Sequence, residues 1–430
     1  MSGRGKWLAS VLLLAGAAPS IGSADAVTAV SSPLPDLITE ALANNADVAA
    51  ARSELEAARE RVAPAGALED PMLELGVINT PLPSLSLQRE DMTMKMLGLG
   101  QKLPFPGKRE LRRSMAALDA DGVESAAFEI TNEVIRDVRR VYEEVVFNAE
   151  AQRLLARTRE EFRILADIAR MRHQVGLAVQ NDVIDAQTEL DRLQAQELAL
   201  QQEAAGLQAE LRRLLGRDAA AATVEATAPA LQSSPEPSAQ LREAALANRP
   251  RLLALQAVVE RNARAIELMQ REYYPDFDLK LQYGQRDRAP DGMPRDDMVS
   301  LTVGVNLPIW RKSRLEPQVA EARAMRTQAE SMLAAERRET LAALDTQLAS
   351  VRQWRSTAAL YQDTLLPQVK AAVTSAMAAY RVGRVDFLTL RQAELRVLEV
   401  SMALAEAIAR HNIAVADIDL LTGRRPSLSN

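Results

Sequence analysis

The sequence predicts a mainly α-helical protein in which a pair of short β-strands precedes a long helical hairpin, twice along the chain. Two features of the 430-residue chain predict this class: helical periodicity over very long stretches, and strict alternation of apolar and polar residues in short segments. The composition agrees, because aromatic residues are only 3% of the chain while apolar residues make up 47%. Such values are typical of long helices rather than of a core built on aromatic side chains.

Composition also excludes several classes of protein. The chain contains no cysteine, which excludes a disulfide scaffold, a cysteine-rich zinc site, a thiol nucleophile and a lipid attached through cysteine. The net charge of -6 disfavours binding to nucleic acid. An enzyme has little support, since the sequence shows neither a Gly-rich phosphate loop nor a G-x-S-x-G motif. We therefore expect no catalytic residues and no cofactor.

Residues 1–26 have the pattern of a secretory signal peptide. Arg4 and Lys6 form a short basic region, an apolar run of about a dozen residues extends from Trp7 to Ala18, and small residues around Ala24 offer cleavage sites. This run is short for a membrane-spanning helix, although a membrane anchor is the alternative. No later apolar run reaches about 18 residues, so we expect the mature chain to be exported without a transmembrane helix.

The rest of the chain is expected to be a tandem duplication. Short matches recur in the same order and at a constant offset, namely Ala41-Leu42-Ala43-Asn44 with Ala245-Leu246-Ala247-Asn248, Leu103-Pro104 with Leu307-Pro308, and Lys108 with Lys312. Chance does not produce a colinear series across both halves. The sequence therefore divides into a first repeat at residues 27–218, a linker rich in Ala, Ser, Pro and Thr at 219–239, and a second repeat at 240–430.

Each repeat has the same internal order of a first helix, a strand pair and a long helical hairpin. We expect these at residues 35–62, 72–103 and 108–216 in the first repeat, and at 238–272, 276–307 and 312–422 in the second. Each hairpin combines a helix of ~65 residues, roughly 100 Å long, with a return helix after a turn that contains glycine. Apolar residues at spacings of three and four predict that the hairpins pack as antiparallel coiled coils.

The predicted strands have one apolar and one polar face, since apolar residues occupy every second position. Four such strands leave unpaired edges, and a closed transmembrane barrel needs about eight strands or more. Three copies would supply about twelve strands, so we expect a trimer with one β-barrel that the helical hairpins continue as a cylinder. The expected lipid-facing residues include Leu279, Leu281, Val299, Leu301 and Val303.

These features together resemble the TolC-type outer-membrane efflux family. The resemblance rests on the export signal, the duplicated halves, the strand pair before each long hairpin, the basic proline turns and the glycine at each hairpin tip. It implies a homotrimer with a twelve-stranded β-barrel in the outer membrane, in contact with lipid, and an α-helical barrel in the periplasm. It further implies a passive exit duct that assembles with a periplasmic adaptor protein and an inner-membrane pump.

One turn, Leu103-Pro104-Phe105-Pro106-Gly107-Lys108-Arg109, is most similar to the branch of this family that works with heavy-metal pumps of the RND class. The resemblance implies export of heavy-metal cations. Many relatives in that branch carry a lipidated N-terminal cysteine, which this chain lacks. Two other interpretations stay open: a channel of the same fold for drugs or for type I protein secretion, and a soluble periplasmic coiled-coil adaptor or scaffold.

The resemblance places a periplasmic gate near the tip of the second hairpin, at Asp386 and Thr389. In the family an acidic residue at the position of Asp386 narrows the mouth, and threefold symmetry would bring three carboxylates into a ring that attracts cations. Thr389 occupies the family's second acidic position, so the ring here carries fewer charges. The alternative is that Asp386 caps the helix that follows. Asp182, at the matching place in the first hairpin, is expected to be a helix cap.

The resemblance implies that the adaptor docks on the tips of the hairpins, which are marked by Gly176, Leu177, Gly383 and Arg384. The alternative for the two glycines is that they simply allow the turn geometry.

Three methionines, Met92, Met94 and Met96, alternate along one expected strand on its polar side. Thioethers are soft ligands for Cu(I), so these residues are weak metal candidates, although methionine that fills the barrel surface is the favoured alternative. His173 and His411 are far apart, and no His, Asp and Glu cluster has the spacing of metal ligands, so no metal site is expected. Two aromatic residues, Phe105 and Trp310, follow the ends of the expected strands. They would form an aromatic girdle at the lipid interface, or else serve only in packing.

Overall fold

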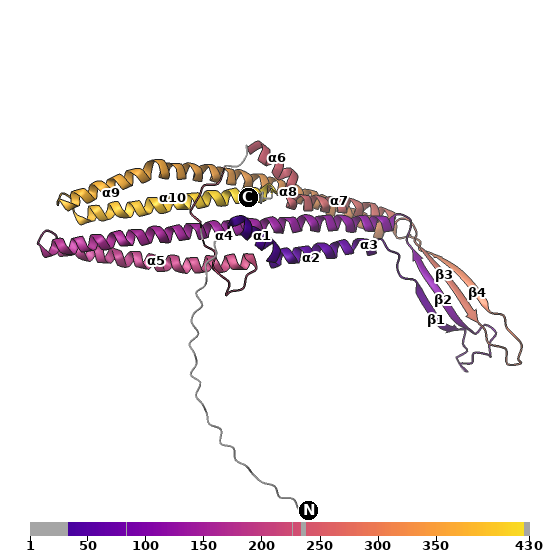
Figure 1. Ribbon diagram of the computed structural model, residues 1–430. Coiled ribbons are helices and arrows are strands. Elements are labelled where there is room, and N and C mark those ends of the chain that lie inside the picture. The colour runs from indigo at the N-terminus through magenta and orange to yellow at the C-terminus, as the bar shows by residue number, and fades with distance from the viewer. Residues whose placement is uncertain (1–32, 83, 226, 234–237, 425–430) are drawn as a thin grey trace, which may run out of the picture.

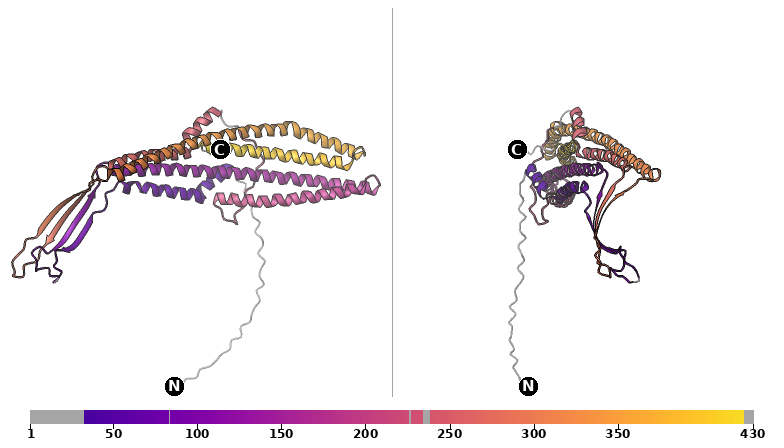
Figure 2. Two further views of the ribbon diagram at one scale, coloured as in Figure 1. Left: turned by 180° about the vertical axis from the view of Figure 1, so that it is seen from behind. Right: turned by 90° about the vertical axis from the view of Figure 1, so that its right-hand side faces the viewer.

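The computed structural model describes residues 33–82, 84–225, 227–233 and 238–424. The signal peptide expected at residues 1–26 lies outside the described residues. The described chain forms an elongated bundle of long helices with a four-stranded sheet at one end, inclined to the helices (Figure 1; Figure 2 gives two further views). Within these ranges, no helix is both long enough and apolar enough to cross a membrane.

Both halves of the chain follow one order of elements: short helices, then two strands, then a long helical hairpin. The first half contains α1 (Leu34–Asn44), α2 (Ala46–Glu60), α3 (Val62–Ala65), β1 (Met72–Ile78), β2 (Met94–Leu103), α4 (Lys108–Gln174) and α5 (Gln180–Leu215). The second half contains α6 (Ser238–Asn248), α7 (Pro250–Arg271), β3 (Phe277–Gln285), β4 (Met298–Val305), the π-helical turn η1 (Arg311–Leu315), α8 (Glu316–Leu360), the π-helical turn η2 (Tyr361–Leu365), α9 (Leu366–Arg381) and α10 (Phe387–Leu421).

The first helix of each half is interrupted, whereas the sequence predicts one continuous helix. Asn45 is extended and caps α2: its Oδ1 accepts hydrogen bonds from the backbone N–H groups of Asp47 at 2.8 Å and Val48 at 3.2 Å. Its Nδ2 donates to the backbone carbonyl of Leu214 at 2.9 Å. In the second half the break falls at Arg249, because a residue that precedes a proline is pushed out of the helical region.

Long helices form the two hairpins. α4 has 67 residues, which makes it roughly 100 Å long. Its counterpart, expected as one helix over residues 314–381, contains the π-helical turn η2. Pro367 follows η2 and lacks the N–H that would donate back to the carbonyl of Asp363, so the regular ladder is interrupted there. Figure 1 shows the tips of the two hairpins side by side, at the end of the bundle away from the sheet.

The strands form one antiparallel sheet in the order β1-β2-β3-β4, so the central pair joins the two halves. One row across the sheet runs from Leu73 to Leu99, Leu281 and Leu301, each residue paired with the next. Apolar positions of all four strands therefore share one face. β2 begins at Met94 rather than at Met92 as expected, because residues 91–92 form a turn.

Equivalent apolar clusters fill the two halves of the bundle. In the first half, Leu37 of α1, Val138 of α4 and Leu211 of α5 are fully buried in one cluster. In the second, Leu241 of α6 and Leu344 of α8 belong to the corresponding cluster with α10. Near the hairpin tips a further cluster combines both hairpins, with buried members Leu165, Ala166, Ala186, Tyr380, Phe387 and Leu390.

The segment between the halves packs along the bundle. The backbone of Val224 exchanges two hydrogen bonds with the side chain of Gln208, at 2.8 and 3.0 Å. Gln232 donates its backbone N–H to Oδ1 of Asn412 at 3.0 Å, and Asn412 donates to the carboxylate of Glu143 at 3.0 Å. Since Glu143 lies on α4 and Asn412 on α10, this segment is part of a polar network that links the two hairpins.

Lys108 ties the sheet to the bundle. Its side chain is 1% exposed, and Nζ contacts the carboxylates of Glu272 at 3.0 Å and Asp276 at 2.9 Å. The backbone N–H of Phe105 also donates to Asp276, at 2.7 Å. Burial alone would raise the pKa of Asp276, but the hydrogen bonds from Lys108 and Phe105 outweigh it and hold that pKa below its ordinary value. The turn from β2 into α4 is thus fixed to the connection from α7 to β3.

We predict that Lys108→Met lowers the free energy of unfolding by about 2 kcal/mol, because the substitution leaves two partly buried carboxylates without their cation. Lys102→Met is the matched control: its side chain is 61% exposed and pairs with an exposed Glu69, so its loss should cost about 0.5 kcal/mol or less. Denaturant unfolding in detergent, followed by circular dichroism, measures both values. Equal losses would show that the buried lysine has no special part in the fold.

Candidate functional site

Two surfaces at opposite ends of the molecule are candidates for function: the apolar face of the sheet and the tips of the hairpins (Figure 1).

The apolar sheet face is exposed in the single chain. Leu281 and Leu301, neighbours in the register, are 51% and 67% exposed, and Val299 is 70% exposed. Leu279 and Val303 pair on the same face, so all five residues expected to face lipid lie together. The face continues across β1 and β2 through exposed Leu73, Leu75, Leu97 and Leu99. An apolar surface that spans four strands indicates contact with a membrane or with another protein.

The opposite face carries charged and hydroxyl side chains on β3 and β4, together with methionines on β1 and β2. Lys280 and Glu74 form an ion pair of 2.8 Å across it, and Ser300 and Thr302 lie on the same side of β4. On β3 and β4 the two faces therefore differ in polarity, as expected for a sheet between an apolar and an aqueous phase.

The methionine candidates do not form one stripe. Met92 lies in a turn and is 52% exposed, whereas Met94 is buried at 7% exposure. The sulfur of Met94 fills the space that a side chain would take at Gly284 in β3. This contact supports a packing role for Met94. Within the described ranges, no group of three or more His, Cys, Asp or Glu side chains could hold a metal ion.

Gly176 and Gly383 form the hairpin tips, with backbone φ angles of 74° and 73° that glycine adopts without strain. Leu177 is 68% exposed, and Arg384 is exposed as well. Apolar side chains next to both glycines are also open, with Val175 and Val382 each 68% exposed.

Arg172 ties one tip to the other. Its guanidinium donates to the backbone carbonyl of Tyr380 and lies 4.7 Å from the centre of the Tyr380 ring. It also donates to the carbonyl of Leu177 at 3.4 Å. Tyr380 itself is 2% exposed. Neither residue stands out in the sequence, because no local pattern indicates that residues 208 positions apart meet.

Asp386 is the N-cap of α10. Its Oδ1 accepts from the backbone N–H of Thr389 at 2.9 Å and from the Thr389 hydroxyl at 2.5 Å. These hydrogen bonds, the hydroxyl first, hold the pKa of Asp386 below its ordinary value, so this exposed carboxylate is charged at neutral pH. Thr389 is therefore the hydrogen-bond partner of Asp386 in the N-cap of α10.

Asp182 is not a helix cap, contrary to the sequence-based expectation. α5 begins at Gln180 with Val179 as its N-cap, so Asp182 lies inside the first turn. Burial raises the pKa of Asp182, and the nearby carboxylates of Asp185 and Asp386 raise it further, while Arg172 opposes them. The influence of Asp386 means that acidic side chains from both hairpins approach one another at the tips.

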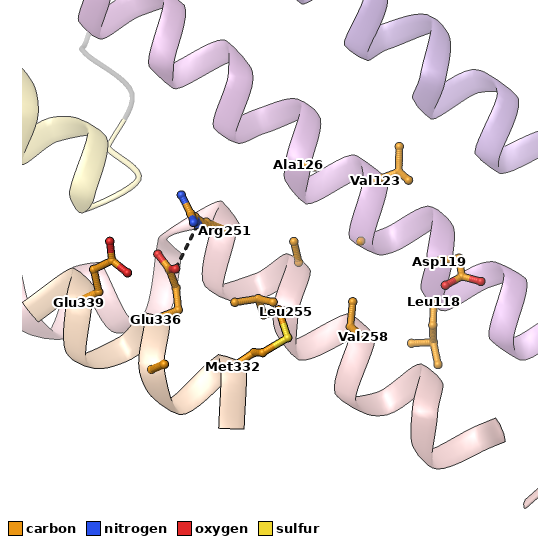
Figure 3. A pocket seen from close by; sticks show the side chains of 13 residues that line it. Leu118, Asp119, Val123, Ala126, Arg251, Leu255, Val258, Met332, Glu336 and Glu339 are labelled. Carbon is orange, nitrogen blue, oxygen red and sulfur yellow. Dashed lines mark ion pairs between the residues drawn. The ribbon is translucent and has the colours of Figure 1, made fainter. Parts of the chain in front are cut away.

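A groove of about 610 Å³ lies between α4, α7 and α8 (Figure 3). Leu255, Val258 and Met332 line it together with an ion pair between Arg251 and Glu336 of 3.1 Å. Its lining residues include no Ser, Cys, His or Lys that could act as a nucleophile.

One comparison with known proteins identifies a family. The family model described as "Outer membrane efflux protein" matches residues 37–217 and 241–424, which is more than half of the chain. A search of curated proteins finds no match.

Solved structures share the fold at low sequence identity. VceC, an outer membrane protein of Vibrio cholerae, has 18% identity and a TM-score of 0.78, over 91% of this chain and 96% of that chain. CusC, studied for folding and transmembrane channel formation, has 16% identity and a TM-score of 0.78, over 92% and 93%. The open state of the MtrE outer membrane channel of Neisseria gonorrhoeae has 16% identity and a TM-score of 0.74, over 96% and 98%.

Proposed function

The chain belongs to the outer membrane efflux protein family, and we propose that it is the exit duct of a tripartite efflux system for heavy-metal cations. Members of this family are passive channels and not enzymes, and they form trimers that work with a periplasmic adaptor and an inner-membrane pump. The proposal assigns this chain an RND-type pump as its partner. It places the sheet in the outer membrane and the helical bundle in the periplasm.

The observation that carries this proposal is the exposed apolar face of the sheet. Its residues would be buried against hydrocarbon, while the polar face, with Glu74 and Lys280, would line a water-filled lumen. The outer edges of β1 and β4 have no partner strand among the residues that the structure describes. In a bilayer such edges must be paired, and three copies would pair them in a twelve-stranded barrel.

The hairpin tips would form the periplasmic mouth. Asp386, held charged by Thr389, lies near Asp182 of the other hairpin, and threefold symmetry would multiply these carboxylates around one axis. The exposed tips at Gly176, Leu177, Gly383 and Arg384 would be the surface on which the adaptor docks.

Two observations support a metal substrate: the turn at residues 103–109 resembles the heavy-metal branch, and the tips carry acidic side chains that attract cations. A channel for drugs or for type I protein secretion is the alternative, because a passive tube of the same fold would serve either. A strain that lacks the protein separates these substrates. Greater sensitivity to heavy metals would favour a metal channel, whereas greater sensitivity to drugs or a loss of protein secretion would favour the alternatives.

The oligomer and its location test the proposal directly. An amine-reactive crosslinker applied to isolated membranes should give species of up to three copies, and density fractionation should place the protein with outer-membrane porins. A monomer in the soluble periplasmic fraction would contradict an exit duct and favour the adaptor or scaffold.

Neighbouring residues of β4 test which face meets lipid. Leu301→Arg should reduce trimer yield in the outer membrane, because an arginine near the bilayer midplane costs roughly 2–4 kcal/mol. Thr302→Arg, one residue further and on the polar face, is the control and should assemble normally. The yield is measured by crosslinking in the membrane fraction. The reverse result would mean that the polar face is outside.

Charge at Asp386 can be separated from its role as a helix cap. Asp386→Asn should keep the cap, because asparagine is as good an N-cap as aspartate, but it removes the charge. We expect block of single-channel current by divalent cations, added from the periplasmic side, to weaken several-fold in this variant. Asp167→Asn, an exposed carboxylate paired within α4, is the control. Equal block in parent and Asp386→Asn would show that Asp386 is a cap alone.

A further inference from the structure

A second groove, of about 550 Å³, lies between the two hairpins and is lined by α4 of the first and by α9 and α10 of the second (Figure 1). It begins next to the π-helical turn η2, since Leu366, the first residue of α9, is part of its lining. Such turns occur often at functional sites. The volume of the groove is in the range of pockets that bind small molecules.

Glu394 interrupts the apolar seam of α10 inside this groove. Leu390 and Leu398, about one turn before and after it, are buried, so their spacing of four predicts an apolar residue at 394. Glu394 is nevertheless only 7% exposed, and it lines the groove. No hydrogen bond or ion pair joins its carboxylate to any residue that the structure describes. A buried carboxylate without a partner is costly, so it needs either a proton or a cation.

The charges nearest to Glu394 do not supply that cation. Burial, together with the carboxylate of Glu161, raises the pKa of Glu394 to about 7, and Arg157 opposes them. The guanidinium of Arg157, however, is paired with Glu161 at 3.1 Å. Glu394 therefore titrates near neutral pH, and a cation bound beside it would favour its charged form.

Six ionisable side chains line the groove, and four of them pair within α4. Besides the pair just described, Arg153 donates to Glu150 at 2.8 Å. The two that remain are Glu394 on α10 and Lys370 on α9. Lys370 is exposed, and its ammonium group has no hydrogen bond or ion pair with the described residues. The groove therefore offers one buried carboxylate and one exposed ammonium group that lack partners.

We propose that this groove binds a small aliphatic zwitterion, with its ammonium group on Glu394 and its acidic group on Lys370. Leu154 of α4, Val373 of α9 and Val397 of α10 line the same groove and would contact the aliphatic chain. A zwitterion meets both unpaired charges, whereas an alkylammonium ion or a carboxylate meets only one of them. The inference goes beyond the proposed exit duct and does not require the trimer.

Binding of ω-amino acids of increasing chain length, with ε-aminohexanoate as the middle member, tests the site. Isothermal titration calorimetry on the full chain in detergent should show binding, and Glu394→Gln and Lys370→Met should each weaken it about tenfold, because each removes a charged hydrogen bond. Glu330→Gln, which removes an exposed carboxylate paired with Arg326 on α8, is the matched control and should keep the parent affinity.

Hexylamine and hexanoate, each with one charged end, are the control ligands and should bind more weakly than ε-aminohexanoate. Hexylamine binding as tight as that of the amino acid, and unchanged in Lys370→Met, would overturn the assignment of a zwitterion. Absence of binding by every member of the series would overturn the inference as a whole. Neither outcome bears on the trimer or its location, so the proposed duct would stand.

The pH dependence of binding identifies Glu394 as the group that meets the ammonium. Because a cation binds the charged form of Glu394, whose pKa is about 7, affinity should rise with pH and be several-fold weaker at about pH 6 than at about pH 8. The charged groups of the ligand titrate outside this range. The dependence should disappear in Glu394→Gln. Binding to the parent that does not change with pH would contradict the contact with Glu394.

Discussion

The buried ammonium group of Lys108 is the interaction on which the arrangement of sheet and helices depends. A charge that is 1% exposed must be met by partners of opposite charge, and both of its carboxylates come from the other half of the chain. This one group therefore holds the end of α7 and the start of β3 against the turn from β2 into α4. The pairing of β2 with β3, which makes one sheet out of two hairpins, follows from the same placement.

The helices bury their apolar side chains, whereas the sheet leaves its apolar side chains exposed. The hairpins bury Leu, Val and Ala against one another, so the bundle has its own core. A single four-stranded sheet has no second layer, and the apolar residues of its strands stay open. The sheet thus has a surface that a lone chain in water cannot stabilise, and hydrocarbon together with further copies would cover it. In the proposed duct, further copies would also pair its two outer edges, which have no partner strand among the described residues.

The far end of the molecule combines a contact between the two hairpin tips with an interruption in one of the long helices. Arg172 holds the two tips together through Tyr380, and acidic residues of both hairpins lie close enough to raise the pKa of Asp182. Between tips and sheet, the π-helical turn before Pro367 interrupts the regular helix of the second hairpin.

The sequence by itself determined the duplication, the long hairpins, the strand pairs and the apolar face with Leu281 and Leu301, because these follow from local periodicity and repetition. Tertiary structure alone decided that the side chain of Asn45, besides capping α2, also binds the carbonyl of Leu214, and that Arg172 meets Tyr380. It likewise decided that Asp182 lies near Asp386 instead of capping α5. Such features depend on groups far apart in the chain, and no local pattern specifies which of them meet when the two halves pack.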